Sequence, residues 1–212
     1  MKRYHIIIAA MTCVMQTALA GPGVSLLEIG GGYINPEGVD GSSILTAAYG
    51  IVVDERVDIS IGLGYSNKTY TKLSDVADTS YASGVIQKTV TKNMEYHTTL
   101  LPVMAHVNVR IPFSPPLAWY AGGSASYTFL FNKERNYEEG IEEKRIYRGI
   151  NWILRAGMEY TIGSRSAIFA EAMYNIGNVK RNVDETVKGL PIWDEVSLRG
   201  FGLRAGLRLE FF

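Results

Sequence analysis

The sequence has one cysteine, no excess of charge of either sign, and no long apolar run beyond its first twenty residues. With Cys13 as its one thiol, the chain has no second cysteine for an internal disulfide. The 21 basic and 21 acidic residues cancel, which argues against a nucleic-acid-binding surface and an acidic disordered tail. A membrane-spanning helix would need about 18 consecutive apolar residues, and no such run follows residue 20.

The motifs of common nucleotide, metal and redox sites are missing as well. The chain contains no GxxxxGK[ST], no HExxH and no CxxC, which argues against a phosphate-binding loop, a zinc protease and a thiol redox centre. We therefore expect no cofactor and no metal. Gly30, Gly31 and Gly32 lie inside an extended segment, where they indicate close backbone packing.

The first twenty residues form a distinct segment. Lys2 and Arg3 give it a basic start, residues 6–19 are largely apolar, and residues 18–20 (Ala-Leu-Ala) have the small-x-small form that signal peptidase accepts. We expect a signal peptide over residues 1–20, cleaved after Ala20, and a single exported domain over residues 21–212. Cys13 would leave with the peptide, so the exported domain would have no thiolate nucleophile.

The rest of the chain has the pattern of eight extended segments. Each is longer than the roughly five or six residues typical of strands in soluble proteins, and exceeds the roughly 9–11 residues that a tilted strand needs to cross a bilayer. The segments span residues 24–35, 43–53, 57–69, 94–111, 117–131, 148–162, 167–180 and 197–212.

Short turns alternate with long polar connections between these segments. The short turns are 54–56, 112–116 and 163–166, the long connections are 70–93, 132–147 and 181–196, and 36–42 is of middling length. This order is typical of up-and-down outer-membrane barrels, which have short periplasmic turns and long extracellular loops. An even number of strands then places both ends of the domain on the short-turn side.

A period-two pattern indicates which face of each segment is apolar. In the last segment one face carries Phe201, Leu203, Ala205, Leu207, Leu209 and Phe211, and the other carries Gly202, Arg204, Gly206, Arg208 and Glu210. The polar faces are mostly Gly, Ser and Thr, which suit the crowded interior of a barrel of about eight strands. A soluble lipocalin-like barrel would instead have Lys and Glu on its polar face. The sequence therefore predicts an all-β, eight-stranded antiparallel up-and-down transmembrane β-barrel.

This phase turns a set of charged residues into the lumen. They are Glu28, Asp58, Glu159, Glu171 and Glu210 against Arg110, Arg155, Arg204 and Arg208. Buried charges need ionic and hydrogen-bonding partners to be tolerated. Two interpretations stay open: an ion-pair network that plugs the lumen, or a path for protons or ions. We favour the plug because eight strands leave little room for water.

Aromatic residues gather toward the ends of the segments, where the girdles of membrane barrels lie. The predicted girdle consists of Trp119, Tyr127, Phe129, Trp152, Tyr160, Tyr174 and Phe211.

On these features the chain resembles the small outer-membrane barrels of the OmpA/OmpX type and the porin-like outer membrane β-barrel domain family. Residues 99–107 (TLLPVMAHV) are similar to an (I/L)P(L/V)-L segment frequent in the porin-like family. The resemblance implies the fold, and it implies the barrel-insertion machinery as a partner during biogenesis. One departure concerns the C-terminal signal that the barrel-insertion machinery reads. In the family the final Phe is usually in phase with aromatic or apolar residues two and four places earlier. Here Phe211, and not Phe212, shares the phase of Leu209 and Leu207.

Two histidines remain as candidates for chemistry. Some small barrels act on lipid A, and a deacylase would need a His, a Ser and an acidic partner. His97 faces outward with Thr99 on the same face, and no His-x-Ser occurs, so we predict no enzyme. His106 faces inward near Asn108 and Arg110, where a hydrogen-bonded lumen histidine is favoured over a metal ligand.

The long connections are the best candidates for function, because barrels carry variable function on loops held by a rigid scaffold. Connection 70–93 would extend its strands above the membrane. Connection 132–147 mixes acidic and basic residues that would contact lipopolysaccharide phosphates, against the alternative of a solvated loop without a partner. We predict a structural or surface-interaction protein of the cell outer membrane, with outer-membrane lipids and lipopolysaccharide around it and an extracellular ligand at 70–93, 132–147 or 181–196. The alternatives are a narrow porin-like channel for small solutes and a lipid A-modifying enzyme that uses His97.

Overall fold

A computed structural model describes residues 24–54, 56–77, 88–136, 141–187 and 190–211. The predicted signal peptide and Phe212 lie outside them. The described residues form nine strands: β1 (Ser25–Pro36), β2 (Ser42–Asp54), β3 (Val57–Ala77), β4 (Lys88–Ser114), β5 (Leu117–Asn136), β6 (Ile141–Gly163), β7 (Ser166–Val187), β8 (Leu190–Ser197) and β9 (Gly200–Phe211). Within this part of the chain, no helix has the length and apolarity that crossing a membrane requires.

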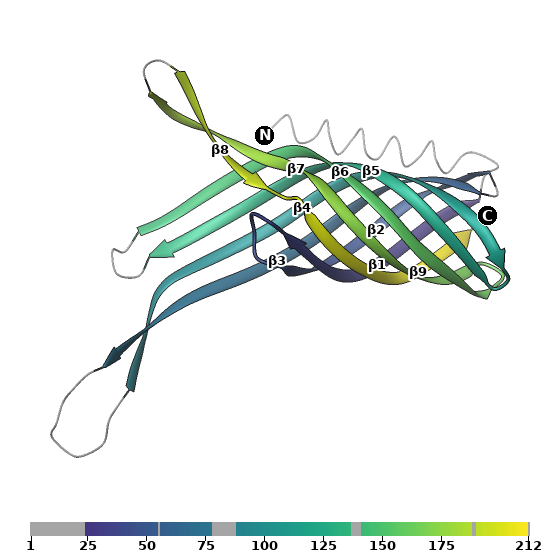
Figure 1. Ribbon diagram of the computed structural model, residues 1–212, viewed down its shortest axis with the longest axis horizontal. Helices are drawn as coiled ribbons and strands as arrows, with labels where there is room; N and C mark the ends of the chain where they lie inside the picture. Colours follow the sequence, from purple (N-terminus) through teal and green to yellow (C-terminus); the bar gives the residue numbers. More distant parts are fainter. Residues whose placement is uncertain (1–23, 55, 78–87, 137–140, 188–189, 212) are drawn as a thin grey trace.

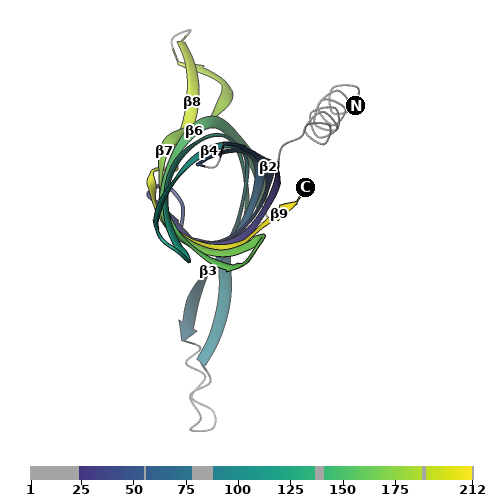
Figure 2. The same ribbon diagram turned by 90° about the vertical axis from the view of Figure 1, so that its right-hand side faces the viewer.

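Eight of the strands close into an antiparallel ring. Strands β1 to β7 each pair with the next strand along the chain, and β9 pairs with both β7 and β1. Strand β8 pairs with β7 alone among the described strands, so it is the outward continuation of β9 beyond Leu198 and Arg199. Figure 2 shows the ring end on. The predicted eight-stranded up-and-down barrel is confirmed.

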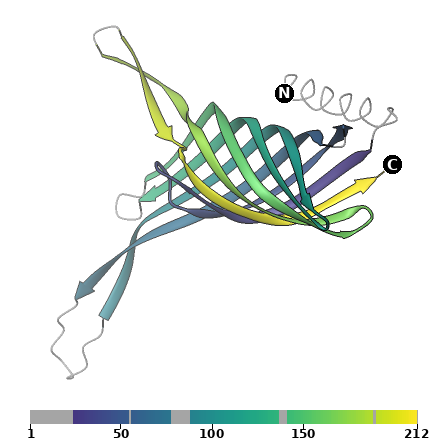
Figure 3. The ribbon, with the colours of Figure 1, turned by 45° about the vertical axis from the view of Figure 1, so that its right-hand side comes forward.

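The two ends of the barrel differ in their connections. Short turns join β2 to β3, β4 to β5 and β6 to β7 at the end where β1 begins and β9 ends (Figure 1). At the other end the pairs β3–β4, β5–β6 and β7–β8 run on as two-stranded hairpins, and the first and last of these project away from the ring (Figure 3).

These hairpins bear out the expectation that connection 70–93 extends its strands, and they correct the predicted bounds of the strands. Strand β3 continues to Ala77 and β4 begins at Lys88, so much of 70–93 is paired strand, and the same holds for 132–147 and 181–196. Beyond the barrel both faces of a strand meet water. The sequence there loses the apolar alternation that identifies a strand, and it has the composition of a loop.

Side chains alternate between the lumen and the outer surface along each strand. On β9, Phe201 and Leu203 are about 70% exposed (72% and 68%), whereas Arg204 and Arg208 are buried. The outer surface is therefore apolar and the interior polar, the reverse of a soluble barrel. An apolar exterior of this kind is stable when lipid covers it.

Close packing inside the ring explains one of the glycines of β1. A Cβ atom on Gly30 would lie 2.9 Å from Cζ of Phe169, an inward ring that is 1% exposed. On the outside, a Cβ on Gly123 would meet nothing within 4 Å. The predicted close approach at residues 30–32 therefore has a specific cause at Gly30, because an aromatic ring fills the space.

Candidate functional site

The charged residues of the lumen form two clusters, and the lower one lies toward the short-turn end. Arg208 donates to Oδ2 of Asp58 at 2.8 Å and to Oε1 of Glu159 at 3.1 Å. Arg110 donates to Oε1 of Glu210 at 2.8 Å and lies 3.5 Å from Glu159. Asp58, Glu159 and Arg208 are buried, whereas Arg110 and Glu210 reach the mouth of the barrel.

The upper cluster centres on Arg204. Its Nε donates to Glu171 at 2.8 Å, its Nη2 to Glu28 at 2.5 Å and its Nη1 to Oγ1 of Thr46 at 2.6 Å. Arg155 lies 3.6 Å from Glu171 and 3.7 Å from Glu28. Each buried carboxylate of this cluster therefore faces two guanidinium groups, which compensate part of the cost of removing the charges from water.

Asn108 joins the two clusters. Its Nδ2 donates to Oδ1 of Asp58 at 2.8 Å in the lower cluster, and its Oδ1 accepts from Nη2 of Arg155 at 2.7 Å in the upper one. The result is one connected network that contains all nine charged residues predicted to face the lumen. With Thr46 of β2 and Tyr120 of β5, it draws a side chain from each of the eight strands of the ring.

Two large aromatic residues of the lumen were missed from the sequence. The Tyr120 hydroxyl donates to Oε2 of Glu171 at 2.7 Å, and the Phe169 ring lies below the Arg204 guanidinium, with Cζ 5.0 Å from the ring centroid. Both were detectable by phase. Tyr120 lies on the same face of its strand as the inward Gly122 and Ser124, and Phe169 lies on the same face as the inward Glu171. The expectation that rings belong on the lipid side concealed them.

Above the upper cluster the lumen changes from ionic to apolar. A cavity of about 70 Å³ lies there, lined in part by Ile34, Leu100, Met104, Ile153 and Met173. Toward the hairpin end it is followed by an apolar cluster of Leu100, Leu130, Tyr147, Val179 and Leu198. From the short turns outward, the lumen therefore contains first the ionic network, then the cavity, and then the apolar cluster.

The two histidines lie where the alternation puts them. His106 is buried in the lumen, with Nδ1 2.6 Å from Oγ of Ser124. His97 faces outward, with Nδ1 2.7 Å from Oγ1 of Thr69 and Nε2 3.1 Å from Nδ2 of Asn67. Neutral side chains therefore engage both ring nitrogens of His97. Among the described residues, no group of three or more His, Cys, Asp and Glu side chains is arranged to hold a metal ion.

Charged residues on the β5–β8 wall of the outer mouth pair with one another. Arg145 bonds Glu143 at 2.5 Å and lies 3.5 Å from Glu134, while Arg181 bonds Asp194 at 2.8 Å. The hydrogen bond from Arg145 lowers the pKa of the Glu143 carboxyl. Such exposed pairs contribute little to stability one by one. Arg181 also lies 3.9 Å from Glu143, so an ion pair links the β7–β8 hairpin to the β5–β6 hairpin.

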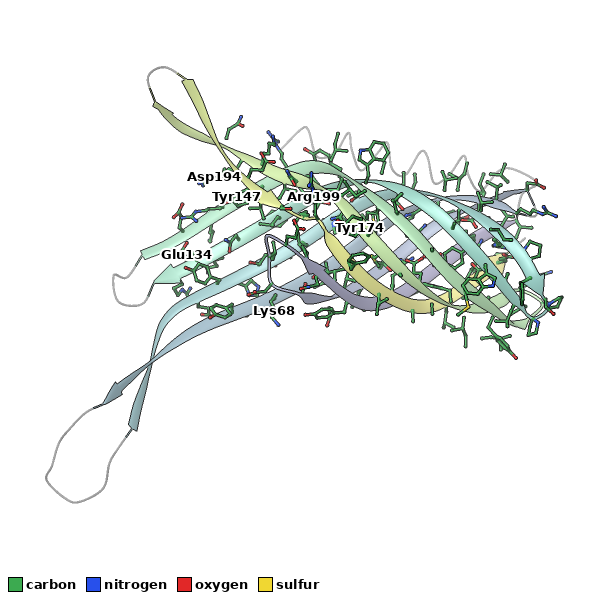
Figure 4. The ribbon with its side chains drawn as sticks, in the orientation of Figure 1. Lys68, Glu134, Tyr147, Tyr174, Asp194 and Arg199 are labelled. Atoms are coloured by element: carbon green, nitrogen blue, oxygen red, sulfur yellow. The ribbon has the colours of Figure 1, made fainter. Side chains whose placement is uncertain are left out.

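An open basin of about 600 Å³ lies at the outer mouth. Its lining includes Asp40, Lys68, Tyr70, Tyr96, Asn132 and Tyr147, from the β1–β2 connection and from β3 to β6. Figure 4 labels Lys68, Glu134, Tyr147 and Asp194, all toward the end of the barrel from which the hairpins project. The volume of the basin lies within the range of ligand sites, about 300–1,000 Å³.

The predicted girdle residues lie on the outer surface in two groups. Trp119, Tyr160 and Phe211 lie near the short turns, and Tyr127, Phe129, Trp152 and Tyr174 lie farther along their strands. Trp119 and Phe129 are ten positions apart on β5, which in a tilted strand spans about 25 Å along the axis, the height of the apolar band of such barrels. Contact of either group with a membrane interface stays a prediction.

Comparison with known proteins places the chain by fold. No protein-family model matches it, and the search of curated protein sequences gives no match either. Among solved structures it is similar to the outer membrane protein OprG from Pseudomonas aeruginosa (TM-score 0.62, 13% identity, 89% of this chain and 96% of that one). It is also similar to Neisserial surface protein A (0.56, 14%, 89% and 96%) and to a major outer membrane protein from Thermus thermophilus (0.53, 12%, 88% and 99%). At these identities the likeness shows the fold alone, which is the β-barrel of these small outer-membrane proteins.

Proposed function

We propose that the protein is a closed barrel of a bacterial outer membrane that acts at the cell surface through its hairpins. The apolar outer surface and the barrel fold support the location, and the three hairpins at one end support a role in surface interaction. The barrel itself serves as a rigid anchor, and the lumen is not a route for solutes.

One observation supports a closed lumen above all others. The ionic network takes a side chain from every strand of the ring, and its central members Asp58, Arg155 and Arg204 are at most 5% exposed. A continuous water path would have to separate these groups, and removing one partner of a buried ion pair typically costs about 3–5 kcal/mol. The apolar cluster above the network adds a second barrier.

Recordings across planar lipid bilayers test this proposal. We expect the purified barrel to insert without producing steady openings under voltage. Steady openings would instead support the alternative of a narrow channel for small solutes, and they would contradict a plugged lumen. A barrel of larger bore inserted in the same bilayer is the control for the recording.

Cell fractionation tests the location. We expect the protein in the outer-membrane fraction after density separation, with heat-modifiable mobility and with a first residue of Gly21 after cleavage of the signal peptide. If the barrel-insertion machinery inserts the protein, its recovery in the outer-membrane fraction should depend on that machinery. Recovery in the soluble periplasm without heat-modifiable mobility would overturn the membrane assignment.

Lipopolysaccharide contact through the β5–β6 hairpin remains a part of the proposal. The cations Lys133 and Arg135 lie 2.9 Å and 2.7 Å from Glu142, whereas Lys144 lies farther from the same carboxylate, at 3.6 Å, and is 71% exposed. Lys144 is therefore the first candidate for a phosphate contact. The enzyme alternative would require release of fatty acid from lipopolysaccharide, lost on His97→Ala.

A further inference from the structure

We infer that the basin at the outer mouth binds one neutral pyranose unit of a glycan, an inference that rests on the proposed surface role. The basin opens outward, and Leu130, Tyr147 and Val196 belong both to its lining and to the apolar layer that closes the lumen below it. A ligand would therefore enter from outside the cell and stop at this floor. Three features of the basin indicate a sugar.

The first feature is an aromatic surface that is open to solvent. Tyr70 and Tyr96 are direct partners in the β3–β4 register, with ring centroids 6.4 Å apart and ring planes tilted by 40°. Tyr70 is 51% exposed. One face of a pyranose carries C–H groups of slight positive charge, which are attracted to the negative face of an aromatic ring.

The second feature is a pair of charged side chains, one acidic and one basic, that line the basin. Within the described part of the chain, no hydrogen bond or ion pair engages Asp40 or Lys68, although both line the basin. The charges of the opposite wall, such as Arg145 and Arg181, are paired. A carboxylate accepts from sugar hydroxyls and an ammonium donates to them, so Asp40 and Lys68 provide both kinds of contact.

The third feature is a wall that is fixed before any ligand arrives. The backbone N–H of Glu37 donates to the carbonyl of Arg199 at 2.7 Å, and that of Gly38 to the carbonyl of Ser197 at 2.9 Å. A Cβ on Gly38 would lie 2.9 Å from the Ser197 nitrogen, so glycine permits this approach. The β1–β2 connection therefore presents Asp40 from a preorganised position, which reduces the entropy lost on binding.

The charge balance of the basin selects among ligand classes. Glu37 and Asp40 outnumber Lys68 in the lining, so a phosphate or sulfate would meet net repulsion. A quaternary ammonium group, which the tyrosine rings and the two carboxylates would attract, is the competing ligand class and has no group that could bond Lys68. An uncharged ligand with an apolar face and a hydroxyl edge can contact the rings, the carboxylate and the ammonium together. A pyranose ring has this amphipathic form.

Saturation-transfer NMR on the full barrel in lipid nanodiscs tests the inference. The probes are methyl α-mannoside, methyl β-galactoside and methyl β-N-acetylglucosaminide, with tetramethylammonium and inorganic phosphate as charged comparisons. We expect at least one glycoside to bind in the millimolar range, and its affinity to fall by about tenfold in the double variant Tyr70→Ala/Tyr96→Ala. The matched control is Tyr160→Ala, which removes a tyrosine of equal exposure (51%) at the opposite end of the barrel and should leave binding unchanged.

The outcomes separate this inference from the proposed function. Binding of none of the three glycosides, or binding of a charged comparison alone, would overturn the sugar site while leaving the conductance result untouched. An equal loss in Tyr160→Ala would also overturn it, because the basin would then not be the binding site. Heat-modifiable mobility confirms that each variant is folded.

Two sources of the sugar can be told apart in a second arm of the same measurement. If nanodiscs that contain lipopolysaccharide lose the glycoside signal, the occupant is a sugar of the cell's own surface. If the signal persists, the occupant is a glycan from outside. Both results support the pyranose site.

Discussion

Asn108 has a position in the lumen that no charged residue could fill as well. It donates to Asp58 and accepts from Arg155 with the two ends of one amide. A carboxylate in its place would face Asp58 with like charge, and a guanidinium would face Arg155 in the same way. Only a side chain that both donates and accepts can join an acidic group to a basic one at this point.

Replacing Asn108 by leucine is therefore expected to destabilise the barrel. The substitution removes the hydrogen-bond partner of Oδ1 of Asp58 and that of Nη2 of Arg155, and the expected loss is about 2–4 kcal/mol of the free energy of unfolding. Urea unfolding in lipid vesicles measures it. Asn182→Leu changes an exposed asparagine of β7 and should cost much less; similar losses in the two variants would contradict the bridging role.

A second prediction at this scale concerns Gly30. In Gly30→Ala the new methyl group would press on the Phe169 ring at 2.9 Å, and overpacking of this kind typically costs about 1–3 kcal/mol. Gly123→Ala is the control, because a Cβ there meets nothing within 4 Å. Most of the loss should be recovered in Gly30→Ala/Phe169→Leu, where the ring has been removed. Failure of this rescue would show that the backbone, and not the ring, sets the requirement for glycine.

The sequence predicts lumen residues well where chemistry and phase agree. Glu171 and Arg204 were identified because charges in phase with glycine and serine have no place on a lipid surface. Tyr120 and Phe169 were missed because rings suit both lipid and a packed interior, and composition cannot distinguish the two. The contact geometry of Asn108 was also beyond reach, since it depends on the register between strands far apart in the chain.

The hairpins are the elements that the sequence described least well. A strand in a barrel wall has one apolar and one polar face, but a hairpin above the membrane has water on both sides. Its pairing is set by the backbone and by cross-strand contacts such as Arg135 with Glu142, which are partners in the β5–β6 register. Such contacts become visible only when the register is known, so the predicted strand ends stopped short.

The β5–β6 hairpin gives a pH-dependent prediction. The hydrogen bonds of Glu142, first from Arg135 and then from Lys133, lower its carboxyl pKa from 4.5 to about 2. Because the folded-state pKa is lowered, the contribution of this pair is present above pH 4.5 and is lost as the pH falls through about 2. NMR titration of the Glu142 carboxyl carbon should find a midpoint near pH 2.

Variants of the cations test the cause of that shift. Arg135→Ala should raise the Glu142 pKa toward its ordinary value. Lys144→Ala should have little effect, because Lys144 is 71% exposed and its Nζ lies 3.6 Å from the carboxylate. A Glu142 midpoint that stays low in Arg135→Ala would rule out this hydrogen bond as the main cause.

At the scale of the whole molecule, the last strand closes both the sheet and the ionic network. Strand β9 pairs with β1 and β7, and it supplies Arg204 and Arg208, two of the four arginines of the lumen. Before it docks, the acidic residues of β1, β3, β6 and β7 lack these partners. Closure of the ring by β9 therefore completes the ionic network, whose other two arginines lie on β4 and β6, and it joins residues as far apart in the chain as Asp58 and Arg208.

Removing one of these arginines should consequently destabilise the entire barrel. Arg208→Met keeps most of the side-chain volume but removes the guanidinium that donates to Oδ2 of Asp58 and to Oε1 of Glu159, and the expected loss is about 3–5 kcal/mol. Lys180→Met is the control, since Lys180 and Glu195 form an exposed pair on the β7–β8 hairpin, where about 1 kcal/mol or less is at stake. Urea unfolding in vesicles compares the two variants. The double variant Arg208→Met/Glu159→Gln should recover part of the lost stability, because one of the unpaired charges has been removed. A double variant less stable than Arg208→Met alone would contradict this. It would mean that Glu159 is held by Arg110 and does not depend on closure by β9.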